Sequence, residues 1–330
     1  MKQSSFALGA VAVAAMLALS GQAFAAADVN ANVEIDNTSS SGSAVASDSQ
    51  GLSQGGRVEI NISSKAGEGA YVAGRGTLIA NKNGGASTDD MWVQLGNASG
   101  DVKIGRFEAA DLFPLINDTL VDHAGSVYAA NNLRGRIGGG AFQAAGTLML
   151  GSAASLEINL IDATKTEMAS TSSFAQNTGT NAKGARAVLS FGAGAFSGRI
   201  GFEAGQYKDA GTGANKVQGY GLTGTYDAGS FKVTGNYAKG LQDAVSDNNE
   251  SAFGLSVGVG GFGAGYVSAT NDKAGGDVKV TTAYLAYSIP LFGVKGASVT
   301  PAISTSTVKD SVLGTSLDKN SVRVRVHYDF

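Results

Sequence analysis

Short segments of alternating polar and apolar residues recur along most of this chain. In the final segment, SVRVRVHYDF at residues 321–330, the valines and aromatics take one parity and the ionisable residues take the other. Successive side chains of a β-strand point to opposite faces, so this segment predicts a strand with one apolar and one ionisable face. The segments RVEINI at 57–62 and LEINL at 156–160 show the same pattern.

The alternation predicts an all-β fold of about sixteen strands, separated by turn-rich clusters of Gly, Asp, Asn and Ser. The first predicted strand has the weakest pattern, and residues 139–151 could contain a further strand. No repeat and no linker divides the chain into domains. The predicted strands are 29–36, 56–64, 70–80, 90–97, 100–107, 131–138, 154–161, 184–192, 196–206, 216–227, 230–239, 249–258, 261–270, 277–289, 297–307 and 320–330.

Three features favour a transmembrane antiparallel β-barrel over a soluble all-β domain, which remains the alternative. Long polar loops tend to alternate with tight turns, as they do in outer-membrane barrels. Charge is confined to one parity through most strands, as expected if the other parity faces lipid. The outward parity carries aromatic residues near strand ends, as an interfacial girdle would: Tyr226, Phe231, Tyr237, Tyr287 and Tyr328.

The N-terminal segment has the features of a cleaved secretion signal. Lys2 supplies a positive charge, residues 6–19 are apolar and Ala-rich, and Ala-Phe-Ala at 23–25 is a small-residue cleavage motif. We therefore expect residues 1–25 to be a signal peptide and residues 26–330 to form the barrel domain.

Composition excludes several classes of function. The chain has 330 residues, a net charge of −3, 48 Gly, 3 Pro and no Cys, and only 15% of its residues are charged. Without Cys there are no disulfides or zinc-thiolate sites, and the net charge gives no reason to expect a nucleic-acid partner. High Gly with low Pro fits many strands joined by turns.

We expect no enzyme, no cofactor and no metal site. The chain has two histidines, His123 and His327, which are far apart and make no metal-ligand spacing. G-x-S-x-G occurs at 51–55 and 254–258 and G-x-G-x-x-G at 258–263, but none lies in the strand–turn–helix context that its chemistry requires. An outer-membrane hydrolase is the enzyme alternative, and no serine is placed beside either histidine by any pattern.

The longest interior stretch without alternation is EAADLFPLINDTLVDHAGSVYAA at residues 108–130. An irregular segment cannot face lipid at membrane depth, so it must lie outside the barrel or fold into it. It contains four acidic residues, Glu108, Asp111, Asp118 and Asp122. The flanking predicted strands carry Arg57, Arg75, Arg134 and Arg136 on the parity assigned to the lumen.

The signal segment, the strand GDVKIGRFE at 100–108, the acidic stretch, NNLRGR at 131–136 and the terminal HYDF together resemble the Gram-negative trimeric porins. The sequence of residues 88–137, which includes MWVQLG and GRFEAADLFP, resembles the carbohydrate branch of these porins, the raffinose-type glycoporins. The resemblance implies sixteen strands and a third outer loop that folds inward to constrict the pore.

In such porins the acidic residues of that loop face a cluster of arginines on the opposite wall. Carried onto this chain, the loop acids are Glu108, Asp111, Asp118 and Asp122, and the basic wall is Arg57, Arg75, Arg106, Arg134 and Arg136. Arg106 shares the parity of lipid-facing Val102 and Ile104, so a reversed parity or a bulge near Gly105 must re-aim it. The resemblance also makes the terminal aromatic Phe330 a signal for the outer-membrane assembly machinery.

We therefore expect a passive diffusion channel of the outer membrane for ions and small hydrophilic solutes, with sugars or oligosaccharides as the preferred solutes. A general non-specific porin and a structural or adhesive barrel are the alternatives. Expected partners are membrane lipid, the solutes, the assembly machinery and two further copies in a homotrimer. Aromatic residues that could stack on sugar rings are Tyr71, Trp92, Phe107, Phe113 and Tyr128.

Overall fold

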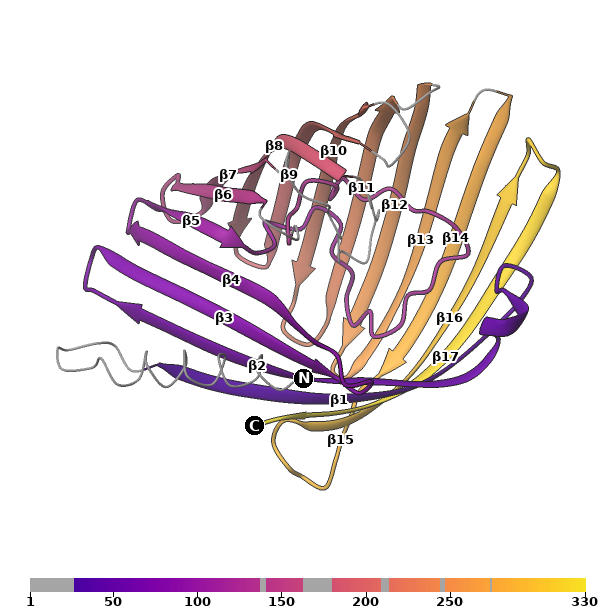
Figure 1. Ribbon diagram of the computed structural model, residues 1–330, viewed down its shortest axis with the longest axis horizontal. Helices are drawn as coiled ribbons and strands as arrows, with labels where there is room; N and C mark the ends of the chain where they lie inside the picture. The colour runs from indigo at the N-terminus through magenta and orange to yellow at the C-terminus, as the bar shows by residue number, and fades with distance from the viewer. Residues whose placement is uncertain (1–26, 137–140, 163–179, 209–213, 244–246, 274) are drawn as a thin grey trace, which may run out of the picture.

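The chain forms one antiparallel sheet that closes on itself. The computed structural model describes residues 27–136, 141–162, 180–208, 214–243, 247–273 and 275–330. Each strand pairs with its sequence neighbour, and β1 also pairs with β17, so the sheet has no free edge among the described residues (Figure 1). Closure gives the backbone N–H and C=O groups of every strand a neighbouring strand to pair with, which is necessary because lipid offers no hydrogen-bond partners. No helix within the described ranges is long and apolar enough to cross a membrane.

The sheet contains seventeen strand segments and one short 3₁₀ helix, Ser47–Ser49. The segments are β1 (Asp28–Ser41), β2 (Gly51–Ala66), β3 (Tyr71–Asn81), β4 (Ala86–Asn97), β5 (Gly100–Arg106), β6 (Phe142–Met149), β7 (Ala154–Asp162), β8 (Thr180–Ala193), β9 (Phe196–Lys208), β10 (Ala214–Asp227), β11 (Lys232–Asp243), β12 (Asp247–Val259), β13 (Phe262–Lys273), β14 (Gly276–Tyr287), β15 (Ile289–Pro290), β16 (Ala297–Asp310) and β17 (Thr315–Asp329).

Segments β14 and β15 pair with β16 in the same register, so they are one strand interrupted at Ser288, and the described barrel has sixteen strands. The predicted all-β barrel is confirmed. The predicted strand at 131–138 is wrong, because residues 131–136 lie in a loop and the sixth strand runs over Phe142–Met149. The alternating sequence NNLRGR therefore belongs to a loop, in which Arg134 and Arg136 form ion pairs with carboxylates.

The two faces of the strands separate as the alternation predicts. On β17 the outward Val322 and Val326 are 51% and 43% exposed, whereas Arg323 and Arg325 are partly covered on the lumen side. β1 pairs with β17 and with β2 along most of its length, so the strand with the weakest pattern closes the barrel.

Short turns and both ends of the described chain lie at one rim of the barrel. The turns at 98–99, 194–195 and 260–261 lie at this rim, and the Ala31 backbone N–H donates to the Phe330 carbonyl there at 2.9 Å. Outward aromatic rings cluster near the same rim, with the Phe196 and Tyr226 ring centroids 4.7 Å apart. Aromatic residues favour the membrane interface, so this short-turn rim carries one predicted girdle.

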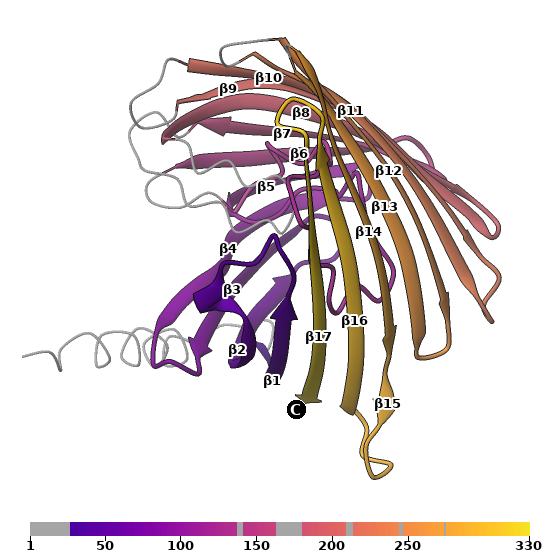
Figure 2. The ribbon, with the colours of Figure 1, turned by 90° about the vertical axis from the view of Figure 1, so that its right-hand side faces the viewer.

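Residues 107–136 of the connection between β5 and β6, here called L3, run inside the barrel across the lumen faces of β8–β16 (Figures 1 and 2). Leu112 and Phe113 on L3 are fully buried against this wall, which we call the loop seat. The seat consists of apolar and small residues on lumen parity: Val188, Val217, Ala238, Ala252, Val267, Ala269 and Val280, with glycines between them. The hydrophobic core of this barrel therefore lies between L3 and the seat.

Candidate functional site: the uncovered lumen wall and loop L3

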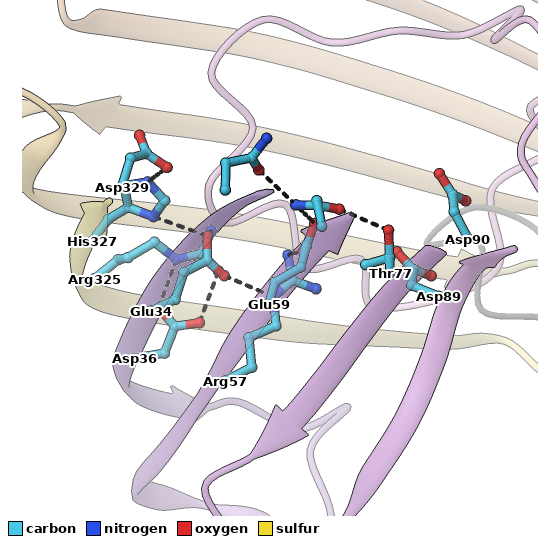
Figure 3. Close-up of polar contacts among 12 residues, drawn as sticks. Glu34, Asp36, Arg57, Glu59, Thr77, Asp89, Asp90, Arg325, His327 and Asp329 are labelled. Atoms are coloured by element: carbon cyan, nitrogen blue, oxygen red, sulfur yellow. Dashed lines mark hydrogen bonds and ion pairs between the residues drawn. The ribbon is translucent and has the colours of Figure 1, made fainter. Parts of the chain in front are cut away.

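A ladder of alternating charges crosses the lumen wall that L3 leaves uncovered. This charged wall is formed by β17, β1, β2, β3 and β4 (Figure 3). Cross-strand register places Glu34 between Arg57 and His327, because Glu34 pairs with both residues in the sheet. The ion pairs in order are Asp36–Arg325 at 2.8 Å, Arg325–Glu34 at 3.1 Å, Glu34–Arg57 at 3.2 Å, Arg57–Glu59 at 3.3 Å, Glu59–Arg75 at 3.9 Å and Arg75–Asp90 at 3.7 Å.

The charges of this ladder are close to balanced, but their exposure is not. The Arg57 and Arg75 side chains are 41% and 36% exposed, whereas that of Glu59 between them is 12% exposed. The guanidinium groups therefore meet the lumen water and the carboxylates lie behind them. A solute in the lumen would meet a positively biased surface on the charged wall.

Sequence reasoning missed the carboxylates of the charged wall. They are Glu34, Asp36, Glu59, Asp89 and Asp90. Glu34 and Asp36 lie in the weakly patterned first strand, and their partners come from the other end of the chain. Glu34 and Asp36 share one parity of their strand, but only strand register shows which arginines they neutralise.

Three of the four predicted loop acids serve to hold L3 together. The Glu108 carboxylate contacts Arg134 at 3.1 Å, and Asp111 contacts Arg134 at 3.4 Å. Asp122 binds Lys319 at 2.5 Å and accepts a hydrogen bond from the Ser321 hydroxyl at 2.6 Å, so it fastens the loop to β17. These carboxylates are structural partners in this fold.

Asp118 differs from the other loop acids. It is exposed to the lumen water, and none of the ion pairs among the described residues includes it. Desolvation inside the narrow barrel raises the pKa of the Asp118 carboxyl, the negative charge of Asp111 adds to the rise, and Arg325 opposes it. Asp118 is therefore the loop carboxylate that can face the charged wall across the lumen.

The predicted basic wall needs a correction. Arg134 and Arg136 lie on L3 rather than on a strand, and Arg136 joins the loop to the charged wall through Asp89 at 3.0 Å. Arg106 donates to the backbone carbonyls of Asp89 and Arg136. Gly105 has φ of +131°, a value that favours glycine, but β4 and β5 pair without a register shift as far as Arg106, so the predicted bulge near Gly105 is absent.

The five candidate aromatics divide into two groups. Phe107, Phe113 and Tyr128 are 2%, 0% and 3% exposed, so their ring faces are covered by protein and cannot stack on a sugar in this structure. Tyr71 and Trp92 are partly exposed and share lumen parity with Arg75. The Lys103 ammonium lies 4.7 Å from the Trp92 ring centroid, in cation–π range.

The two histidines take structural positions. His123 contacts the Thr282 hydroxyl at 2.7 Å through Nδ1, and burial lowers the pKa of His123 to about 4, so the ring is neutral at pH 7. His327 lies between Glu34 and Asp329 near the short-turn rim. Within the described ranges, no cluster of three or more His, Asp or Glu residues could hold a metal ion.

Replacing Asp118 with asparagine is expected to shift ion selectivity toward anions, because it removes the loop carboxylate that is open to the lumen. The measurement is the reversal potential in a salt gradient. Lowering the pH protonates the Asp118 carboxylate and should shift the selectivity of the native channel toward anions in the same way. Because the pKa of Asp118 is raised, this shift should begin at a higher pH than it would for an ordinary carboxyl group, and Asp118→Asn should not show it. Asp111→Asn, whose carboxylate is paired, is the control with the smaller effect. A native reversal potential in Asp118→Asn would remove Asp118 from the constriction.

Comparison with solved structures finds the same barrel. OmpT of Vibrio cholerae, folded in vitro, matches with a TM-score of 0.66 and 10% identity over 92% of this chain and 97% of its own. A porin refined at 1.8 Å resolution matches with a TM-score of 0.60 and 16% identity over 92% of this chain and all of its own. OpdO of Pseudomonas aeruginosa matches with a TM-score of 0.54 and 12% identity over 92% and 97%. At these identities the likeness shows the fold alone.

Among curated protein sequences none matches this chain. The sequence profile described as porin-like glycoporin RafY matches residues 21–286, which is most of the chain. The chain therefore belongs to this family of porins, the outer-membrane diffusion channels whose barrel it shares.

Proposed function

We propose that this channel passes sugars or oligosaccharides along the charged wall. The observation that carries the proposal is that L3 covers the loop seat and leaves exposed guanidinium groups beside a lumen-facing indole, Arg75 next to Trp92. Sugar rings have apolar C–H faces that pack on aromatic rings, and hydroxyl groups that hydrogen-bond to arginine. The family description, which names a glycoporin, supports the same solute class.

The wider setting belongs to the same proposal. The chain is exported with residues 1–25 as a cleaved signal, a segment that lies outside the described residues, and it assembles as a homotrimer in the outer membrane. One of the matching OmpT structures is described as a trimer form. The assembly machinery recognises the terminal strand that ends at Phe330, which is outward-facing and stacks on Tyr328 with ring centroids 5.7 Å apart.

A general porin without sugar preference is the second candidate. The observation that favours it is the composition of the uncovered lumen wall, which is mostly charged. Of the five candidate aromatics only Tyr71 and Trp92 are partly exposed, and a lysine ammonium lies over each ring. Two rings do not form a continuous stacking track. The two candidates differ in whether neutral sugars interrupt the ion current.

In a planar bilayer, raffinose or maltodextrins are expected to interrupt ohmic current steps, because a bound sugar displaces ions from the constriction. Trp92→Ala should shorten these interruptions. Phe202→Ala, which truncates an aromatic side chain on the outward face in the same way, should not. Absence of conductance would refute the channel, and steps insensitive to every sugar would favour the general porin.

A further inference from the structure

A recess of about 510 Å³ lies on the short-turn side of L3. One side is formed by Pro114–Asn117 of the loop, and the other by the lumen faces of β8–β11. Figure 1 shows L3 passing in front of these strands. The volume falls within the roughly 300–1,000 Å³ of small-molecule sites and is large enough for a sugar of one or two rings. Hydroxyl groups line the strand side: Ser190, Ser197, Thr223, Thr225 and Thr234.

The recess contains one arginine, Arg199, that forms no ion pair within 4 Å among the described residues. Arg199 Nη1 donates to the Asp111 backbone carbonyl at 2.9 Å. Lys232, at the edge of the recess, is neutralised by Asp227 at 2.8 Å. The recess therefore holds about one net positive charge, in contrast to the balanced charged wall.

Arg199 uses only part of its hydrogen-bonding capacity to support the loop. A guanidinium group has five N–H donors in a planar fork, and the Asp111 carbonyl takes one of them. The remaining donors match a carboxylate or a phosphate group, which accept two parallel hydrogen bonds from arginine. The surrounding hydroxyls can donate to and accept from the hydroxyls of a sugar; Thr225 and Thr234 lie 2.9 Å apart and can share such a group.

We infer that this recess is a binding subsite for a polyhydroxylated solute with one anionic group, that is, a sugar acid or a sugar phosphate. The inference rests on the proposed function and narrows its solute class. Arg199 binds the anionic group, and the serine and threonine hydroxyls bind the ring. A solute that enters from the short-turn rim reaches the subsite without passing the constriction, so the subsite also predicts that binding depends on the side of entry.

The test is single-channel current block with four probes, glucuronate, glucose 6-phosphate, glucose and inorganic phosphate, added to one side at a time. In the native channel the two anionic sugars should block at about tenfold lower concentration than glucose, as expected of a charge-assisted pair of hydrogen bonds. Block should be stronger from the short-turn side. Arg199→Gln should abolish the tenfold difference, and Arg199→Lys should restore part of it.

Two controls separate the subsite from general charge and from loop displacement. Lys239→Gln makes the same change in net charge at an exposed position outside the lumen and should leave the block unchanged. Ser197→Ala with Thr225→Val keeps Arg199 and should weaken block by the anionic sugars but not by phosphate. Equal block by glucose and glucuronate, or block that survives Arg199→Gln, would overturn the subsite, as would inorganic phosphate blocking as strongly as the sugar phosphate. Neutral maltodextrins would still report on the proposed function, so the two can fail separately.

Discussion

Replacing Glu203 with glutamine, or Arg186 with methionine, is expected to turn a steady channel into one that fluctuates among conductance levels. Both side chains are fully buried beneath the base of L3, with Arg186 Nε 3.8 Å from Glu203 Oε2. The Glu203 carboxylate accepts hydrogen bonds from the backbone N–H of Leu133 at 3.2 Å and from Asn132 Nδ2 at 3.0 Å. The pair is therefore the fastening between the returning end of L3 and strands β8 and β9.

Arg186 fastens both ends of the loop at once. It donates to the Asn131 side-chain oxygen at 2.8 Å and to the Ala110 carbonyl, which lie on opposite arms of the L3 base. Removing one member of a buried ion pair leaves an unpaired buried charge and typically costs about 3–5 kcal/mol. The barrel ladder does not depend on this pair, so we expect the loss to appear mainly as loop motion.

Open-channel current noise is the direct measurement, and the unfolding temperature of the barrel in detergent reports the loss of stability. Lys232→Met breaks the exposed Lys232–Asp227 pair at the rim and should change neither, since exposed ion pairs contribute little. The double variant Arg186→Met with Glu203→Leu removes both charges and should recover stability while the noise persists. If Glu203→Gln had native noise, the pair would not control the position of L3.

The lumen and lipid faces were predictable because parity is a local property. Val322 and Arg323 fall on opposite faces whatever the rest of the fold does, and a charge on the lipid face would be costly. The prediction of a strand at 131–138 was wrong for a related reason. Leu133, Arg134 and Arg136 alternate in polarity as strand residues do, but they lie in a loop, and a local pattern cannot distinguish the two. There Arg134 and Arg136 bind carboxylates of the loop and of β4.

The candidate site was less predictable because it depends on register and on where the loop lies. The Asp36–Arg325 contact joins residues that only barrel closure brings together, and the Glu34–Arg57 contact depends on the register of β1 against β2. Glu203 has the lumen parity of its alternating strand, yet it is fully buried beneath L3. The lumen glycines gave a signal in retrospect, because side chains missing from one face leave room for something to pack there.

Alanine at Gly219 and Gly221 of β10 is expected to push L3 off the loop seat and reduce the conductance. A Cβ at Gly221 would lie 2.8 Å from Leu112 Cβ, and a Cβ at Gly219 would overlap the Tyr128 hydroxyl. Leu112 and Tyr128 are almost completely buried, so neither can swing aside. Overpacking of this kind costs roughly 1–3 kcal/mol per site, and the loop can relieve it only by moving toward the charged wall, into the solute path.

The matched control lies on the same strand. Gly224 has outward parity and no atom within 4 Å of an added Cβ, so Gly224→Ala should leave the conductance unchanged and stabilise the barrel slightly. Glu203→Gln and Arg186→Met loosen L3, so the current noise should rise in these variants. Alanine at Gly219 and Gly221 displaces L3 instead, so there the mean conductance should fall. If Gly219→Ala with Gly221→Ala conducted like the native channel, the glycines would not set how closely L3 approaches the wall. The open path along the charged wall would then need another explanation.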